Sequence, residues 1–377
     1  MCVRVQSEGV RGLLHGLRGR PSNHQLDAEP LEQALSVLHD PLWEGFGPKF
    51  ASDKLKDLHG IDLSSQPVRR WMARTGIWQV RRKGARHRTW RPRRPSMGML
   101  VQLDGSDHDW FEGRAARCVL LVYIDDATSR ILHAEFVGVE DTLTLMRTTW
   151  SYLKQWGRPV AFYVDRDSIY TVNRQPTIDE ELRDEQPMTQ FSRAMSKLGV
   201  SVITANSPQA KGRVERGFHT HQDRLVKELR LKGISTMAEA NRFLLDVYIP
   251  DHNRRCSVVA SEPVDAHRPL LAAHDLAAIL ALETPRVLQN DFTIRFGGRL
   301  LQLHNQQPVR IAPKVVVTVQ LRLDGSIHLI FKGRSLAFLP IAERLYRPYL
   351  TARPSDKKQR VSPNVTGVGS VPAKGHP

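Results

Sequence analysis

Residues 118–137, CVLLVYIDDATSRILHAEFV, contain two apolar runs rich in β-branched residues on either side of a short polar segment. The runs at 118–124 and 131–137 predict two strands, and the Asp-Asp-Ala-Thr-Ser sequence at 125–129 has the composition of a turn. A similar apolar run at 99–103 comes before them. Three successive strands with short connections predict an antiparallel meander.

Alternating helix and strand patterns follow the meander. Apolar residues spaced three and four apart predict helices around 143–153 and 188–198, and short apolar runs predict strands at 160–164 and 200–204. The order β-β-β-α-β-α-β-α, completed by one more amphipathic helix, predicts an α/β domain over residues 97–270. The buried stripe of that last helix would be Val214, Phe218, Leu225 and Leu229.

The chain carries a large excess of positive charge. Its 377 residues hold 55 Lys and Arg against 39 Asp and Glu, a formal net charge of +16. This balance favours a polyanionic partner, because Lys and Arg that dock on a nucleic acid backbone release its counterions. A ribosome-associated or simply basic protein would show the same excess.

Other classes of protein are excluded or made improbable by the composition. No apolar run approaches the roughly 20 residues that span a bilayer, and residues 1–20 lack the apolar core of a signal peptide. The three scattered cysteines include no Cys-x-x-Cys, so we expect a reducing cytoplasm and neither a disulfide framework nor a zinc knuckle. His219 and His221 lie two apart on the last predicted helix and are expected to be surface histidines on different faces.

An irregular basic lead-in covers residues 1–29, and residues 30–79 have the periodicity of three short helices. Gly60 is expected to end the second helix, and Ser64 to cap the third. The buried positions of the first two would be Leu31, Ala34, Leu35, Leu38, Ala51, Leu55 and Leu58. The pattern is typical of a helix-turn-helix domain, although any small helical bundle shares it.

Arginines on the third of these helices and in the segment after it are the predicted DNA contacts. Arg69 and Arg70 point outward from the helix, where they could read a major groove. Residues 80–96 have almost no aliphatic residues and predict an extended basic linker that follows phosphates, the alternative being a solvated charge run. The linker contacts would be Arg81, Arg82, Lys83, Arg86, Arg88, Arg91, Arg93 and Arg94.

Three remaining segments have simpler patterns. The polar, acidic stretch at 166–186 predicts a surface insertion or lid. Apolar and polar residues alternate at 292–296, 300–304, 315–323 and 327–331, which predicts four strands of a small antiparallel β-barrel over 285–345, with a hairpin turn at Asp324-Gly325. Residues 351–377, rich in Pro, Ser, Gly and Lys, predict a disordered tail.

Three acidic residues have positions suited to metal-dependent chemistry. Asp104 and Asp165 end predicted strands, and Glu215 lies at the edge of the buried stripe of the last helix. Carboxylates placed this way can hold two divalent cations, the arrangement used for phosphodiester cleavage and transfer. Lys211, on the same helix face as Glu215, and Arg213 are further candidate phosphate contacts; a simple Lys–Glu surface pair is the alternative for Lys211.

Several motifs taken together resemble bacterial insertion-sequence transposases of the retroviral-integrase superfamily, in particular their ISNCY-type group. They are Asp104-Gly-Ser with Asp109-Trp-Phe, Ile124-Asp-Asp-Ala-Thr-Ser129, and Asn206-Ser-Pro-Gln-Ala-Lys-Gly-Arg-Val-Glu-Arg216 followed by Gln222-Asp-Arg-Leu225. The resemblance covers roughly residues 45–270, and the 206–230 block is its most specific part.

The resemblance implies a ribonuclease H-like catalytic core and an acidic (DDE) triad at Asp104, Asp165 and Glu215. The triad would bind two Mg²⁺ ions, for which Mn²⁺ could substitute. The expected activity is 3′-end cleavage and strand transfer on double-stranded DNA, at element ends and target, by a homo-oligomer in the bacterial cytoplasm, associated with the nucleoid. Asp167 is an alternative to Asp165, because similar enzymes often read Asp-Lys-His-Ser where this chain has Val-Asp-Arg-Asp-Ser.

Two departures from the family pattern concern recognition rather than chemistry. The retroviral His/Cys zinc-binding module is absent from the sequence, and related transposases usually carry another helix-turn-helix upstream. A truncated or inactive relic that only binds DNA is therefore the alternative function. A nuclease of RNA–DNA hybrids is a second alternative, which the predicted N-terminal helices and C-terminal β region disfavour. In a third alternative, Asp104, Asp165 and Glu215 are all ordinary surface residues.

Overall fold

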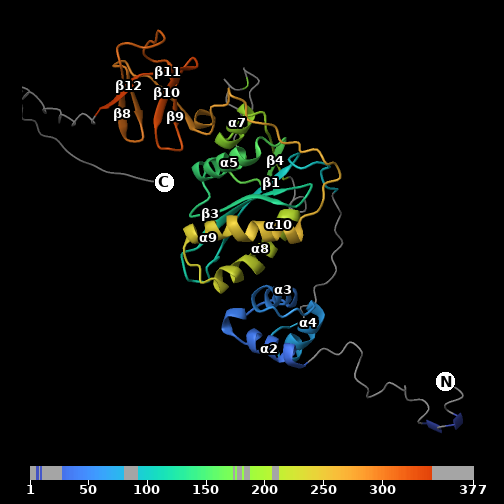
Figure 1. Cartoon of the computed structure of the whole chain (residues 1–377). Helices are drawn as coiled ribbons and strands as arrows, with labels where there is room; N and C mark the ends of the chain where they lie inside the picture. The colour runs from blue at the N-terminus through green and yellow to red at the C-terminus, as the bar shows by residue number, and fades with distance from the viewer. Residues whose placement is uncertain are drawn as a thin grey trace, which may run out of the picture. The chain divides into compact units, whose positions relative to one another are not determined.

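The computed structural model describes residues 6–7, 9–10, 28–79, 92–172, 175, 181, 187–205 and 212–341, without the side chains of Ala28 and of 212–216. The predicted tail and most of the predicted lead-in, basic linker and 166–186 insertion lie outside this description. The chain divides into two compact units (Figure 1). The first unit is Met1–Thr284 with Val319–His328, and the second, here called the C-terminal β unit, is Pro285–Thr318 with Leu329–Pro377.

A five-stranded sheet in the order β3-β2-β1-β4-β5 forms the centre of the first unit. Its strands are β1 (Val101–His108), β2 (Cys118–Asp125), β3 (Ile131–Val137), β4 (Ala161–Val164) and β5 (Ser201–Thr204). β1, β2 and β3 pair antiparallel, whereas β4 pairs parallel with both β1 and β5. The predicted meander and mixed α/β class are confirmed, and the sheet fits the expected ribonuclease H-like core.

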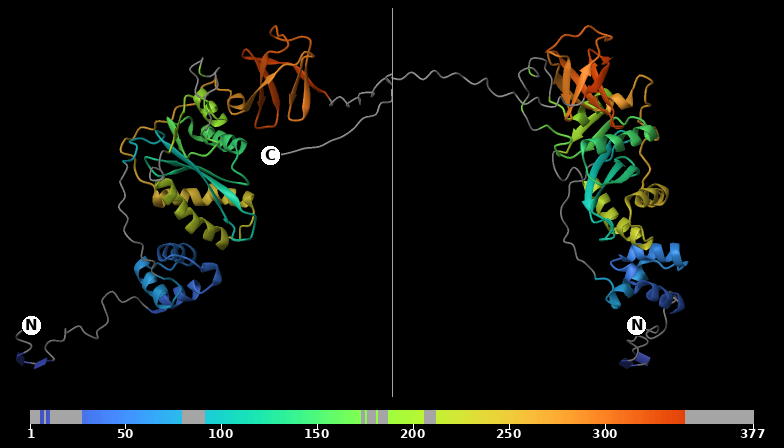
Figure 2. Two further views of the ribbon diagram at one scale, coloured as in Figure 1. Left: turned by 180° about the vertical axis from the view of Figure 1, so that it is seen from behind. Right: turned by 90° about the vertical axis from the view of Figure 1, so that its left-hand side faces the viewer.

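Helices cover both faces of this sheet (Figures 1 and 2). α5 (Thr142–Trp156) and α7 (Gln190–Lys197) lie on one face, and α8 (Gly212–Leu231), α9 (Met237–Phe243) and α10 (Ile249–Cys256) lie on the other. Each face has its own apolar cluster, one built on α5 and α7 and the other on α8 and α9. A π-helical turn, η4 (Leu244–Tyr248), joins α9 to α10, and a short helix, α11 (Leu276–Ile279), follows later.

The first strand is longer than the sequence predicted. We expected it to end at Leu103, but β1 continues to His108 through Asp104, Gly105 and Ser106. Antiparallel pairing with β2 extends from Val101 to His108 and satisfies the backbone of these polar residues, so the strand needs no further apolar side chains. Asp104 therefore lies inside a strand rather than at its end.

Over residues 28–79 the described chain forms α2 (Ala28–Leu38), α3 (Pro48–His59) and α4 (Ser65–Arg74), with a 3-10 turn, η2 (Pro41–Trp43), after α2. Gly60 ends α3 in a left-handed conformation, with φ of 69°, as its position predicted. Ser64 is the N-cap of α4, although its side chain makes no capping hydrogen bond.

Two side chains predicted to be buried on helices are exposed instead. Leu58, in the last turn of α3, is 47% exposed, and Met188 is 56% exposed because α7 begins two residues later, with Thr189 as its N-cap. The period alone could not show that neither helix buries its terminal apolar position.

Seven strands build two sheets from the C-terminal part of the chain. A four-stranded sheet has the order β11-β10-β9-β6, and a three-stranded sheet has the order β12-β8-β7. The strands are β6 (Leu282–Val287), β7 (Thr293–Phe296), β8 (Arg299–Leu303), β9 (Val316–Leu321), β10 (Ile327–Phe331), β11 (Arg334–Leu336) and β12 (Phe338–Ile341). Gly325 turns the chain between β9 and β10 with φ of 80°, at the predicted hairpin. Sequence missed β6, β11 and β12.

Among the described residues, the structure contains no helix that is long and apolar enough to cross a membrane.

The aromatic cluster beneath the sheet should dominate the stability of the first unit. Phe162 is fully buried and its ring packs against those of Tyr123, Tyr152 and Phe191. Phe162→Ala should lower the free energy of unfolding by about 3–5 kcal/mol, because it removes buried surface and leaves a cavity. Urea denaturation followed by circular dichroism would measure this loss. Val160→Ala is a nearby change at a side chain that is 40% exposed, and it should change the free energy of unfolding by less than about 0.5 kcal/mol.

Candidate active site

Strand pairing brings Asp104 and Asp165 to neighbouring positions. β1 and β4 run parallel with Gln102 opposite Tyr163; continued by two residues, just past the end of β4 at Val164, this register sets Asp104 opposite Asp165. Side chains two apart on a strand share a face of the sheet. The two carboxylates therefore project from the same face of adjacent parallel strands, although 61 residues separate them in the sequence.

That face is the one covered by α8. Val122 lies opposite Asp104 across the β1–β2 pair, and it belongs to the apolar cluster that contains Phe218 and Leu225 of α8. Paired residues of antiparallel strands have their side chains on one face. Asp104 accordingly projects toward the helix that carries Glu215.

Two contacts fix α8 against the sheet on either side of Asp104. Gly217 lies so close to β2 that a Cβ there would be 3.1 Å from Cδ1 of Ile124, the partner of Gln102. Nε2 of Gln222 donates to Oγ of Ser106 at 3.0 Å. The helix thus follows β1 from the level of Gln102 to that of Ser106.

Glu215 belongs to the first turn of this helix, two residues before Gly217. At 1.5 Å of rise per residue, two residues correspond to about 3 Å along the helix axis, so the backbone of Glu215 is near the closest helix–strand approach. Its side chain lies outside the described residues, as do the side chain of Arg213 and all of Lys211.

Glu140 is an acidic residue near this pair that the sequence patterns did not single out. Its carboxylate lies against the backbone of β1 at Gly105, where a Cβ would overlap it, so a larger residue after Asp104 would displace this carboxylate. The hydroxyl of Tyr170 donates to Oε1 of Glu140 at 3.3 Å. The available signal was an acid directly before Asp141, whose side chain caps α5.

The electrostatics of Glu140 show how closely the carboxylates gather. Burial, and then the negative charge of Asp104, raise the pKa of Glu140 from 4.5 to about 7, with further contributions from Asp165 and Asp167. A hollow of about 420 Å³, lined by Glu140, Asp167 and the residues next to each, opens beside them. Concentrated negative charge of this kind favours a bound cation, and carboxylate oxygens are the ligands that Mg²⁺ prefers.

Asp165 and Asp167 have different surroundings. Oδ1 of Asp167 accepts from the backbone N–H of Ile169 at 3.0 Å and from the Ser168 hydroxyl at 3.2 Å, and its carbonyl accepts from Tyr170 and Thr171. It therefore caps the turn after β4, although Oδ1 of Asp165 likewise accepts a backbone hydrogen bond, from Asp167 N at 3.0 Å. Asp165 is the one that the β1–β4 register brings opposite Asp104.

The neighbouring acids Asp125 and Asp126 have structural roles. Both are buried, and Asp125 accepts from Gly98 N and from the backbone and hydroxyl of Thr128. Asp126 accepts from the Gln102 amide at 2.6 Å and from Arg94 N at 2.9 Å. Because neighbouring protein groups donate to both, these two carboxylates anchor the segment before β1 to the β2–β3 turn.

The side chains predicted to contact DNA differ in their surroundings. Arg69 and Arg70 are exposed on α4, with Arg69 above the Trp78 ring at 5.2 Å. Arg93 is occupied within the protein, where its guanidinium donates to Asp126 O, Ala127 O and the Ser129 hydroxyl. Arg94 is exposed. Outside the described residues lie Arg81, Arg82, Lys83, Arg86, Arg88 and Arg91.

The prediction of surface histidines on α8 is wrong for His221 and correct for His219. His221 is 1% exposed, and its Nδ1 is 2.8 Å from the Tyr248 hydroxyl. Burial, together with the charge of His252, lowers the pKa of His221 to about 3, so the ring is neutral near pH 7. The π-helical turn η4 ends at Tyr248, a turn that periodicity did not reveal.

Among the described residues no group of three or more His, Cys, Asp or Glu is arranged to hold a metal ion. The side chain of Glu215, the third member of the predicted set, is not among them. The donors that are described, Asp104 and Asp165, fit a hard divalent cation by their oxygen chemistry and shared face.

No protein-family model matches the chain. A curated relative from Sinorhizobium fredii, "Putative transposase y4bF", is 36% identical over 360 residues, which cover 95% of this chain and 74% of that protein. The transposase for insertion sequence IS1202 of Streptococcus pneumoniae is 28% identical over 400 residues, covering 95% and 83%.

Two solved structures are also similar. The simian T-cell lymphotropic virus intasome, in complex with PP2A regulatory subunit B56 gamma, has a TM-score of 0.36 and 12% identity, covering 75% of this chain and 93% of that one. The HTLV-2 integrase catalytic core domain in complex with magnesium (dimeric form) has a TM-score of 0.29 and 14% identity, covering 40% and 88%. At these TM-scores the structural likeness carries no argument of its own.

The sequence relatives define an enzyme of the polynucleotidyl transferase kind, which takes part in DNA recombination. The chain belongs to the bacterial insertion-sequence transposases.

The raised pKa of Glu140 predicts a pH-dependent stability. The folded state holds the Glu140 proton more tightly than the unfolded state, so protonated Glu140 stabilises the fold. This stabilisation is complete below about pH 4.5 and is lost as pH rises through 7. Glu140→Gln should remove this loss of about 1–3 kcal/mol between those limits. Denaturation in EDTA across pH 4–8 would measure it. Glu262→Gln, at an exposed carboxylate, should leave the wild-type profile unchanged.

Proposed function

We propose that this protein is a DDE transposase that cleaves the 3′ ends of an insertion sequence and joins them to target DNA in a metal-dependent reaction. The observation that carries the proposal is the position of Asp104 opposite Asp165 on adjacent parallel strands, on the sheet face covered by the helix of Glu215. Three carboxylates from three separate elements would then converge on one site. DNA binding alone does not require this arrangement.

In this proposal Asp104, Asp165 and Glu215 would together hold two Mg²⁺ ions, for which Mn²⁺ could substitute. Such ions, when bound, activate the attacking oxygen and stabilise the leaving oxygen of an in-line displacement. Gly105 and Glu140 support the site from behind, because the close contact between them fixes the strand next to Asp104. Asp165 is preferred over Asp167 because the β1–β4 register, continued by two residues, carries Asp165 opposite Asp104.

The reaction has two displacements at phosphorus. Water first attacks the phosphodiester at the element end, so that one P–O bond forms, another breaks, and a 3′-hydroxyl is released. That hydroxyl then attacks a phosphodiester of the target DNA, forming the new junction and releasing a target 3′-hydroxyl. Because two element ends must be joined to one target, the active form would be a homo-oligomer on DNA.

The positive charge of the chain would hold double-stranded DNA at the site. Arg69 and Arg70 on α4 are exposed and available for a groove, as a helix-turn-helix would require. The basic linker, residues 80–96, would continue along phosphates toward the catalytic core. Arg93 is the exception, since the protein itself binds its guanidinium.

Substitution of the triad should abolish chemistry while leaving DNA binding intact. Asp104→Asn, Asp165→Asn and Glu215→Gln should each lower Mg²⁺-dependent nicking and joining of an element-end duplex about a thousandfold or more. Loss of a metal ligand removes several kcal/mol of transition-state stabilisation, and each 1.4 kcal/mol is tenfold in rate. Gel assays of the cleaved and joined strands would measure both steps.

Asp167→Asn is the matched control for this series, because it removes a charge close to Asp165 without removing a proposed ligand. It should keep most of the activity. Full activity in Asp165→Asn together with loss in Asp167→Asn would transfer the second position of the triad to Asp167. DNA binding without cleavage by the wild-type protein would instead support a relic that only binds DNA.

The exposed arginines of α4 should contribute to the salt dependence of binding. Replacing Arg69 and Arg70 together by Ala should reduce the slope of log K against log[salt] by about two, since each phosphate contact contributes about 0.9. Fluorescence anisotropy at several salt concentrations would measure the slope. Lys154→Ala, on the surface of α5, should leave it unchanged, and an unchanged slope in the double variant would remove α4 from the DNA interface.

A further inference from the structure

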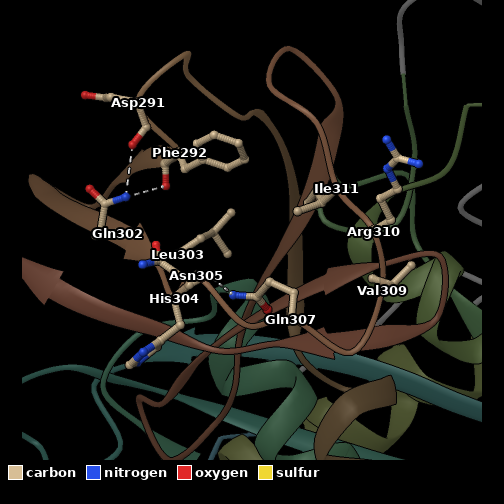
Figure 3. A pocket seen from close by; sticks show the side chains of 10 residues that line it. All are labelled: Asp291, Phe292, Gln302, Leu303, His304, Asn305, Gln307, Val309, Arg310 and Ile311. Atoms are coloured by element: carbon tan, nitrogen blue, oxygen red, sulfur yellow. Dashed lines mark hydrogen bonds between the residues drawn. The ribbon is translucent and has the colours of Figure 1, made fainter.

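The C-terminal β unit contains a hollow of about 640 Å³ that lies outside the candidate active site. Phe292 and Ile311 reach into it from opposite sides, with Leu303 between them at the base (Figure 3). Leu303 is buried, whereas the edge of Phe292 is open to solvent. The result is a slot with an aromatic wall, aliphatic surfaces and an open mouth, within the range of about 300–1,000 Å³ typical of ligand pockets.

Phe292 has a backbone conformation that costs energy for this residue type. Its φ is 57°, in the left-handed region, where a bulky side chain is a genuine outlier and Gly or Asn would fit without strain. Three hydrogen bonds hold it there: Phe292 N donates to Gln289 O, and Phe292 O accepts from Leu303 N and from the Gln302 amide. Its side chain is nonetheless 37% exposed, so burial offsets little of this cost. Strained residues of this kind cluster at functional sites, which indicates a functional role for the Phe292 ring.

The polar groups around the slot divide into engaged and available ones. The carboxylate of Asp291 accepts from the backbone and the hydroxyl of Thr293, and the Gln307 side chain is bonded to backbone groups of His304 and Ala337. Within the described part of the chain, the side chains of Asn305 and Arg310 make no hydrogen bond or ion pair. An amide that can both donate and accept, and a guanidinium, therefore remain for a ligand.

The described part of the C-terminal β unit, which contains the slot, is strongly basic. Residues 285–318 and 329–341 contain seven Lys and Arg and one Asp, a net charge of +6. The single acid is Asp291, which Thr293 already engages. Such a surface attracts a polyanion, and the aromatic wall suits a planar ring.

We propose that this slot binds an unpaired nucleotide of a DNA strand, with its base stacked on Phe292 against Ile311, its edge near Asn305 and its phosphate near Arg310. A paired base has both faces covered by its neighbours, so only an unpaired or extruded base can enter. Aromatic side chains bind any base by stacking, because every base has a π-face. The inference rests on the proposed function in taking DNA as the ligand, and it adds a second, non-catalytic contact that prefers a single-stranded end.

The test compares full-length protein on three duplexes with the same paired length: blunt, with a short 5′ overhang, and with a short 3′ overhang. Anisotropy in EDTA would measure binding without cleavage. The wild type should prefer one overhang over the blunt duplex by about 5- to 100-fold, the range expected from stacking of one base. Which overhang is preferred identifies the strand that carries the unpaired nucleotide.

Phe292→Asn removes the ring and suits the left-handed backbone, so the unit should remain folded; its thermal unfolding midpoint should be no lower than that of the wild type. This variant should bind all three duplexes with the affinity of the blunt one, and Phe292→Tyr should restore the preference. Arg299→Ala is the matched control: Arg299 is an exposed cation on β8 outside the slot, so its loss should weaken all three duplexes equally.

Equal affinity of the wild type for all three duplexes, or an overhang preference that survives Phe292→Asn, would overturn the inference. Neither result would contradict the proposed function, which depends on cleavage and joining by the triad. If the wild type bound none of the three duplexes, both the nucleotide slot and the proposed transposase function would be overturned. Normal cleavage with no overhang preference would leave the transposase assignment standing and remove only the slot.

Discussion

The parallel pairing of β4 with β1 is the constraint on which the candidate site depends. The meander β1-β2-β3 can form from local hairpins, but only the long connection through α5 returns the chain to the open edge of β1. The register, Gln102 opposite Tyr163, then decides which side chains meet. A slip of one residue would turn Asp165 to the other face, among the apolar side chains beneath α5 and α7.

Close approach reinforces this pairing from both faces. On one side Gly217 allows α8 to lie against Ile124, and on the other Gly105 leaves room for the Glu140 carboxylate. Neither position has a backbone angle that demands glycine; at each, an added Cβ would push against a neighbouring side chain. Burial, and then repulsion from Asp104, raise the pKa of Glu140, and a bound cation would reduce the repulsion between the carboxylates.

The acidic residues of the core differ in what surrounds them rather than in type. Asp125 and Asp126 are buried, and backbone and side-chain groups of the protein donate to both, so they hold segments together. Asp167 caps a turn, and Asp104 and Asp165 share a face with α8. Sequence singled out the first pair as turn residues and the last pair as catalytic candidates. It favoured Asp165 over Asp167 because Asp165 directly ends the predicted strand, but the register that carries Asp165 opposite Asp104 is not a local property.

The sequence by itself determined the mixed α/β class, four of the five strand positions of the sheet to within a residue, the caps of the N-terminal helices and the candidate acids. Each of these depends on local periodicity, turn chemistry or the resemblance to known transposases. Only the tertiary structure decided that β1 continues through Asp104, that His221 is buried against Tyr248, and that Glu140 joins the acidic group. It alone showed the slot at Phe292. These features arise from contacts between residues far apart in the chain, which no local pattern of side chains encodes.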